Sequence, residues 1–271
     1  MTSTVEKAPD LGAAPQAAMA PVRRERRSLG SYLFMPVFLA LVCVGLYLYM
    51  SNQELDTIEE RSLNASNIID ATWEHIQLAA VSTVFVVLIA IPLGVLMTRP
   101  FTRSFRGVLL TLANIGQAVP TIGILALLAL GVLSFLNVDI GFTAAIVGLV
   151  AYAVLPVLRN TIVGLGQVDE NILEAGRGMG ISKFGVLTRI ELPLAVPIIL
   201  AGVRTALVIN VGTATLAAYI NAGGLGRIIV AGLSTNRINI QLTGAILTAV
   251  LALLIDYLAG IAEDVLRPKG L

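Results

Sequence analysis

The polar stretch QVDENILEAGRGMGISKFGVLTRIELP, residues 167–193, lies between two long apolar runs and decides how the chain is interpreted. Asp169 is placed to cap a short helix, because an aspartate side chain accepts hydrogen bonds from the free N–H groups of a first helical turn. Gly180 can adopt a positive φ and end that helix, and Pro193 suits the first turn of the next one. Small or apolar residues recur between them at helical spacing: Ile172, Ala175, Gly176 and Met179. The stretch therefore predicts a short amphipathic helix with one small, apolar face that a partner protein can approach.

On both sides of this stretch the chain is strongly apolar. Of its 271 residues, 56% are hydrophobic and only 13% are charged, whereas about a quarter of the residues in a soluble domain are charged. About 20 apolar residues cross a bilayer as a helix. Six runs meet this criterion: 32–50, 75–97, 108–136 with an interruption at Pro120, 141–164, 192–220 and 240–262. The composition therefore predicts an all-α integral membrane protein with six transmembrane helices.

The basic residues indicate how these helices are oriented. With the N-terminus inside, the inner segments hold the arginines between positions 23 and 27 and most other basic residues, while the outer segments hold only Arg61, Arg227 and Arg237. Lys and Arg concentrate in cytoplasmic loops. We therefore expect a multi-pass protein of the bacterial cytoplasmic (inner) membrane with both termini in the cytoplasm.

Four segments are expected along the chain. Residues 1–30 are rich in Ala, Pro and Arg and predict a disordered cytoplasmic tail; 31–50 form an additional N-terminal transmembrane helix, 51–74 an external polar segment, and 75–267 a transmembrane domain that contains the stretch 167–193. Trp73 and His75 are predicted to anchor the second helix at the membrane interface.

Several classes of function are disfavoured by the composition. The single cysteine, Cys43, and the single histidine, His75, predict neither a disulfide nor a metal cluster. A net charge of +1 offers no basic excess for nucleic acid. The chain contains no phosphate-binding Gly-x-x-x-x-Gly-Lys-Ser/Thr motif and no hydrolase motif. We therefore expect no catalytic residues, no cofactor and no bound metal.

The stretch 167–193 resembles the EAA loop of ABC importer permeases, in which Glu-Ala-Ala is followed at fixed spacing by Gly and by Ile-x-Leu-Pro. Six residues fall on this pattern without a gap: Glu174, Ala175, Gly180, Ile190, Leu192 and Pro193. Gly176 stands where the pattern has a second alanine, which keeps the side chain small and lowers helix propensity by about 1 kcal/mol. The resemblance implies that Glu174 to Gly180 form a coupling helix, which docks on an ATPase subunit.

A wider resemblance covers residues 72–267 and is to osmoprotectant permeases, which move glycine betaine, choline or carnitine. It is carried by TWEHIQL at 72–78, IPLG at 91–94, QAVPT at 117–121 and AGGLG at 222–226. The last two stretches also occur in permeases for methionine and other small solutes, which remain the alternative. The resemblance implies a five-helix type I ABC importer (MetI-like) core, spans two to six, with one extra N-terminal helix and a cytoplasmic coupling helix.

The same resemblance implies the partners. Such permeases work as a dimer of one chain or of two related chains, with cytoplasmic ABC ATPase subunits below and an external solute-binding protein above. The membrane lipid is the further contact, and ATP hydrolysis belongs to a separate chain. Alternating access between the two sides of the membrane would move the solute.

Polar residues inside the spans are the candidates for a translocation pathway, because such groups usually face a bundle interior or a wet cavity. They are Asn114, Gln117, Pro120, Tyr152, Asn210, Thr213, Thr215 and Tyr219. Hydrogen bonding between helices explains the polar side chains equally well, and a structural kink explains Pro120. Tyr152, Tyr219 and Tyr257 are the aromatic residues placed to contact a quaternary ammonium group.

Arg204 and Asp256 are charges within the fifth and sixth spans. Each lies 11 residues from the inner end of its span, from Pro193 and from Arg267 respectively, so the two are expected at similar depth and predicted to form an ion pair. A secondary transporter or channel would use intramembrane charges of this kind for ion coupling. That alternative, however, leaves the EAA-like stretch unexplained.

Overall fold

The computed structural model describes residues 29–129 and 141–266, and within them every regular element is a helix. The first half of the chain forms α1 (Leu29–Ser51), α2 (Thr57–Ser62), α3 (Ala65–Met97), the single turn η1 (Pro100–Thr102), α4 (Arg103–Ala118) and α5 (Thr121–Leu127). The second half forms α7 (Phe142–Gly166), α8 (Glu170–Gly178), α9 (Lys183–Val186), η3 (Leu187–Glu191), α10 (Leu192–Ala214), η4 (Thr215–Ile220), α11 (Gly226–Thr235) and α12 (Ile238–Leu266). Residues 1–28 of the predicted tail lie outside the described residues. The end of the predicted third span, residues 130–136, lies outside them as well.

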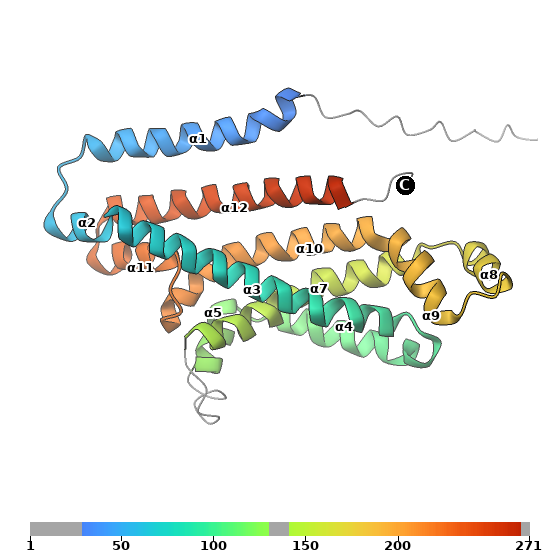
Figure 1. The fold of residues 1–271 in the computed structure, drawn as a ribbon. Helices are drawn as coiled ribbons and strands as arrows, with labels where there is room; N and C mark the ends of the chain where they lie inside the picture. Colours follow the sequence, from blue (N-terminus) through green and yellow to red (C-terminus); the bar gives the residue numbers. More distant parts are fainter. Residues whose placement is uncertain (1–28, 130–140, 267–271) are drawn as a thin grey trace, which may run out of the picture.

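The long helices lie side by side along one direction, with α8 and α9 at one end of the bundle and α2 and α11 at the other (Figure 1). We call these the α8 end and the α11 end. Helix α7 lies at the centre and packs against both α3 and α10. A Cβ at Gly94 of α3 would lie 2.7 Å from Cβ of Thr161, and one at Gly202 of α10 would lie 2.7 Å from Cβ of Asn160. Glycine therefore allows both helices to approach α7 closely, as small residues do in membrane bundles.

The predicted interruption at Pro120 is a sharp bend. Helix α4 ends at Ala118, α5 begins at Thr121, and the two helices are inclined at 94° to each other. Val119 is extended, with ψ 133°, as expected for a residue that precedes proline. Five helices of the described residues are long and apolar enough to span a membrane, and six if the bent pair counts as one. This agrees with the predicted all-α membrane fold.

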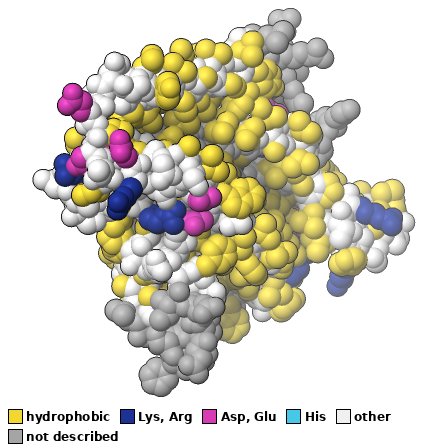
Figure 2. All heavy atoms as spheres, turned by 60° about the vertical axis from the view of Figure 1, so that its left-hand side comes forward, with side chains coloured by type: hydrophobic (Ala, Val, Ile, Leu, Met, Phe, Trp, Pro, Cys, Tyr) yellow, Lys and Arg dark blue, Asp and Glu magenta, His cyan; other side chains and the backbone are white. Residues whose placement is uncertain are grey.

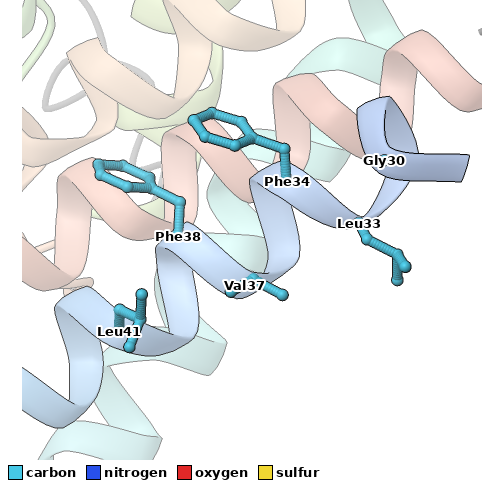
Figure 3. Close-up of a pocket in the computed structure, with 6 residues that line it drawn as sticks. All are labelled: Gly30, Leu33, Phe34, Val37, Phe38 and Leu41. Atoms are coloured by element: carbon cyan, nitrogen blue, oxygen red, sulfur yellow. The ribbon is translucent and has the colours of Figure 1, made fainter. Parts of the chain in front are cut away.

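Helix α1 lies at the edge of the bundle and packs on α12. The hydroxyl of Tyr257 donates a hydrogen bond to the carbonyl of Tyr32 at 2.8 Å. Phe34 and Phe38, both exposed on α1, stack with their ring centroids 6.2 Å apart (Figure 3). The groove beside these rings is lined by residues of α1 alone and is almost entirely apolar. This surface therefore suits contact with lipid rather than with a polar solute.

Residues 51–74, predicted as a polar segment, contain α2 and the first turns of α3. Asp56 caps α2 by accepting hydrogen bonds from two backbone N–H groups, and Asn64 caps α3, so α3 begins ten residues before the predicted span. Arg237, just before α12, contacts Asp56 at 2.6 Å, and the amide of Asn239 donates to Glu59 at 3.1 Å. Charged side chains gather at the α11 end as a result (Figure 2).

Candidate coupling segment and translocation residues

Helix α8 forms where the EAA-like sequence predicts a short helix. The carboxylate of Asp169 accepts a hydrogen bond from the backbone N–H of Asn171 at 2.9 Å, and Gly180 has a φ of +83° beyond the C-terminal end. Both features were predicted from the sequence and are confirmed. Glu170, in the first turn, also pairs with Arg177 at 3.1 Å, with both side chains exposed.

The predicted small face of α8 is divided between two sides of the helix. Leu173 and Gly176 are buried, whereas Ile172 and Met179 are 46% and 74% exposed. Ala175 and Glu174 are exposed as well. A Cβ at Gly176 would lie only 2.7 Å from Cδ1 of Ile190 in η3, so Gly176 faces the chain's own next segment. The prediction that Gly176 shares a partner-facing surface with Ala175 is wrong, because helical spacing alone does not say which neighbour covers a residue.

After a short turn beyond α8, the chain enters a long helical run. Residues 183–220 form one continuous helical run in which Pro193 occupies the first turn of α10, as predicted. Glu191, the last residue of η3, is 5% exposed. Its carboxylate accepts hydrogen bonds from Arg99 at 2.6 and 3.4 Å. This pair was not predicted; the available signal was an arginine two residues after one apolar run and a glutamate directly before another.

Three of the candidate pathway residues meet where α4 packs on α7. The side-chain amide of Gln117 donates to the backbone carbonyl of Tyr152 at 3.3 Å, and the oxygen of Asn114 accepts from Arg159 at 2.5 Å. Arg159 is a residue of α7, within the predicted fourth span.

The candidates on α10 and η4 have other partners. Asn210 is fully buried and donates to the hydroxyl of Thr83 on α3 at 3.0 Å, while its own side-chain oxygen is without a partner among the described residues. The hydroxyls of Thr213 and Thr215 donate to carbonyls of their own helical segment, at 2.8 and 2.7 Å. Tyr219 is 53% exposed on η4. Within the described part of the chain, no hydrogen bond joins these residues to the group at α4 and α7.

At the α11 end, His75 is completely buried, so the prediction that it anchors the helix at the interface is wrong. Its Nδ1 accepts from the backbone N–H of Leu225 at 3.3 Å, and its Nε2 therefore donates to the carbonyl of Val211 at 2.9 Å. The neighbouring Glu74 accepts from the N–H of Gly224 at 2.8 Å. Gly223 and Gly224 have φ values of +86° and +84°, which glycine adopts without strain. The loop after η4 is thereby fastened to α3.

The structure brings Arg204 and Asp256 together between α10 and α12. The guanidinium donates to the two carboxylate oxygens at 2.6 and 2.8 Å. Glu263, about two helical turns further along α12, approaches Arg204 at 3.6 Å. The guanidinium lies over Gly260, where a Cβ would be 3.2 Å from Nη1. The three side chains are about one-quarter to one-third exposed.

Among the described residues, no group of three or more His, Cys, Asp or Glu side chains is arranged to hold a metal ion. The polar groups identified above join helices to one another rather than surrounding a reacting centre. The arrangement is therefore that of a membrane bundle with a protruding helix at one end.

Comparison with solved structures defines the class of protein. The fold resembles a chain of the MetNI methionine ABC transporter, with a TM-score of 0.65 and 26% identity over 74% of this chain and 96% of that one. It also resembles a chain of an amino acid ABC transporter crystallised with histidines, with a TM-score of 0.63 and 18% identity over 78% and 99% of the two chains. The latter likeness concerns the fold alone. The class is the membrane subunit of an ABC importer.

Residues 90–269 match the family described as "Binding-protein-dependent transport system inner membrane component", and the chain belongs to this family. The carnitine transport permease protein OpuCD of Listeria monocytogenes is 41% identical over 78% of this chain and 92% of its own length. The choline transport system permease protein OpuBB of Bacillus subtilis is 39% identical over 77% and 92%. The chain is thus a multi-pass permease subunit that operates with a solute-binding protein and with ATPase subunits on separate chains.

Proposed function

We propose that this chain forms the pathway of an importer for small quaternary ammonium osmolytes, the class that includes glycine betaine, choline and carnitine. The observation that carries the proposal is 41% and 39% identity, over more than three quarters of the chain, to permeases named for carnitine and choline. The chain of a methionine transporter is similar in fold but only 26% identical. Methionine or another small solute is therefore the second candidate.

The proposed orientation places the α8 end in the cytoplasm and the α11 end outside, with both termini inside. The basic residues of the sequence support it, because they concentrate in the segments that this orientation places inside. In the proposed organisation, residues 1–30 are a tail, 31–50 an added helix, 51–74 an external segment and 75–267 the permease domain.

In the proposed mechanism, α8 is the coupling helix on which the ATPase docks. Its exposed side offers Ile172, Ala175 and Met179, with Glu174 beside them, to a groove on that partner. On the side of α8 that faces away from this partner, Gly176 packs against Ile190, and Gly180 ends the helix. Leu192 and Pro193 then continue into α10, so that a displacement of α8 is delivered to a spanning helix. Alternating access follows from movement of spans around the solute path.

For the pathway we propose the region where α4 packs on α7, formed by Asn114, Gln117, Tyr152 and the bend at Pro120. Arg159 supports this choice, because its side chain is exposed in a spanning helix and bonded to Asn114. A charge exposed to lipid is costly, and it is normally found facing a wet cavity or another protein chain. The second permease copy, identical or related, would complete such a cavity.

The proposal is tested with the permease reconstituted in liposomes together with its ATPase and binding protein. ATP-dependent uptake of labelled glycine betaine, choline and carnitine is compared with uptake of labelled methionine. Accumulation of a quaternary ammonium solute supports the proposal, and accumulation of methionine alone refutes it. The coupling assignment is tested separately by Glu174→Lys, which is expected to abolish binding-protein-stimulated ATP hydrolysis. Glu60→Lys on α2, an exposed glutamate at the opposite end, is the matched control.

A further inference from the structure

Helix α3, together with Arg99 just beyond its end, is joined by polar contacts at three levels of the bundle to the helical run 183–220, which contains η3 and α10. At the α11 end, the buried imidazole of His75 donates to the carbonyl of Val211 at 2.9 Å. Midway along, the amide of Asn210 donates to Thr83 at 3.0 Å. At the α8 end, the contact is the ion pair between Arg99 and Glu191. Only this third contact reaches the segment that follows α8.

The side chain of Arg99 binds both α3 and η3. Its Nε donates to the carbonyl of Val95 in the last turn of α3, at 3.2 Å. Its terminal nitrogens donate to the two carboxylate oxygens of Glu191 at 3.4 and 2.6 Å. The Glu191 side chain is only 6% exposed, whereas that of Arg99 is 29% exposed. A buried carboxylate with a bidentate arginine partner is held in one geometry, because the alternative is an unpaired buried charge.

The chain itself provides no direct route from α8 to α3. A displacement of α8 passes through α9 and η3 into α10, since residues 183–220 are one continuous helical run. Helix α3 ends at Met97, far before this run begins at Lys183, and can receive the displacement only through contacts. Glu191 lies at the junction of η3 and α10, directly before Leu192. The ion pair is therefore located where motion of the coupling segment enters the membrane bundle.

We propose that the Arg99–Glu191 ion pair is a positioning element that makes the α8 end of α3 move together with α10 when the ATPase displaces the coupling segment. The proposal rests on the proposed coupling role of α8. It assigns to both residues a role in transmitting motion, distinct from contact with the ATPase or with the solute. Without the pair, α10 would move while α3 stays behind, and ATP would be hydrolysed without opening the path fully.

The test compares the wild type with Glu191→Gln in the complete complex of permease, ATPase and binding protein. Glutamine removes the charge but leaves no unpaired buried carboxylate. The ratio of solute moved to ATP hydrolysed is expected to fall at least about fivefold, the lower end of typical coupling between two sites. The ATPase subunits should still co-purify with the permease. Arg99→Lys keeps the charge but loses the bidentate contact. Its ratio of solute moved to ATP hydrolysed is expected to lie between those of the wild type and Glu191→Gln. Glu60→Gln, the same substitution at an exposed glutamate of α2 outside the coupling segment, is the matched control and should keep the wild-type ratio.

A second measurement does not depend on which solute is carried. Spin labels at Leu96 and Thr188, both exposed, report the distance between the last turn of α3 and η3 in a Cys43→Ser background. Labelled permease is diluted with unlabelled permease, and distances are compared without nucleotide and with ATP trapped by vanadate. The wild type should give the same distance without nucleotide and with trapped ATP. Glu191→Gln should give a different distance in each of the two states.

The outcomes separate this proposal from the others. Equal distances in both states of Glu191→Gln, or a wild-type transport ratio, would overturn it. Loss of the ATPase from the purified complex would also overturn it, because the pair would then serve docking. If the wild type accumulates none of the quaternary ammonium solutes, the substrate proposal fails while the distance measurement still decides the role of the ion pair.

Discussion

Replacement of Arg204 should destabilise the bundle more than replacement of its partner Asp256. The reason is the second carboxylate of Glu263, 3.6 Å from the guanidinium. Asp256→Asn leaves Arg204 with Glu263 as a remaining partner. Arg204→Gln instead leaves two carboxylates on α12, about two helical turns apart, with no cation between them. The two single variants of the same ion pair are therefore predicted to differ.

The magnitude follows from the burial of the pair. Breaking a fully buried ion pair costs about 3–5 kcal/mol, and breaking an exposed one costs about 0–1 kcal/mol. The side chains of Arg204 and Asp256 are 33% and 31% exposed, between these limits. We expect a loss of about 1 kcal/mol for Asp256→Asn and about 3 kcal/mol for Arg204→Gln. The double variant should be more stable than Arg204→Gln alone, because it removes one of the two uncompensated charges.

The assay is thermal unfolding of purified permease in detergent, followed as loss of the monodisperse peak in size-exclusion chromatography. The expected order of apparent melting temperatures is wild type, Asp256→Asn, double variant and Arg204→Gln. Equal losses for the two single variants would show that Glu263 does not share the guanidinium, and the reasoning would be wrong. Gly260→Ala provides an independent check, since its Cβ would lie 3.2 Å from Nη1 and force the guanidinium to move.

Three further predictions concern single residues outside this ion pair. Gly226→Ala should cost at least about 1–3 kcal/mol, because its Cβ would overlap the carbonyl oxygen of Thr215; the yield of folded permease measures this. Gly176→Ala should be tolerated, since only the flexible end of Ile190 must shift, whereas Gly176→Leu should displace α8 and weaken ATPase co-purification. Hydrogen bonds from backbone N–H groups hold the pKa of Asp56 below its usual 3.8, so its stabilising effect is complete above pH 3.8 and is lost as the pH falls through the lowered value. In the wild type, protease cleavage near α2 should increase as the pH falls through this lowered pKa. An Asp56→Asn variant should show no such increase.

Local features of the coupling segment were predictable because they depend on nearby residues. The cap at Asp169, the positive φ of Gly180 and the place of Pro193 each follow from one side chain and its own backbone. The bend at Pro120 has the same origin, since proline lacks a backbone donor. The six apolar runs were likewise recognisable because a bilayer sets the length of a helix.

Which side of a helix faces which neighbour was not predictable to the same degree. Gly176 and Ala175 are adjacent in sequence, yet one is buried against Ile190 and the other is exposed. His75 looked like an interface residue because it lies near the start of an apolar run, but the loop around Leu225 covers it. Both outcomes depend on residues distant in sequence, and a single sequence without aligned relatives carries little information about such contacts.

The polar residues of this bundle mainly form hydrogen bonds between helices, and the apolar surroundings in a membrane are the reason that such bonds are needed. Lipid tails are as apolar as leucine, so burial of apolar surface does little to set the relative position of two spans. Close packing at glycine and hydrogen bonds between side chains must set it instead. Helices α3 and α10 use the contacts of His75, Asn210 and Glu191 in this way. A change at any one of these residues leaves the apolar contacts in place, so it should alter the relative position of the two helices before it alters the fold.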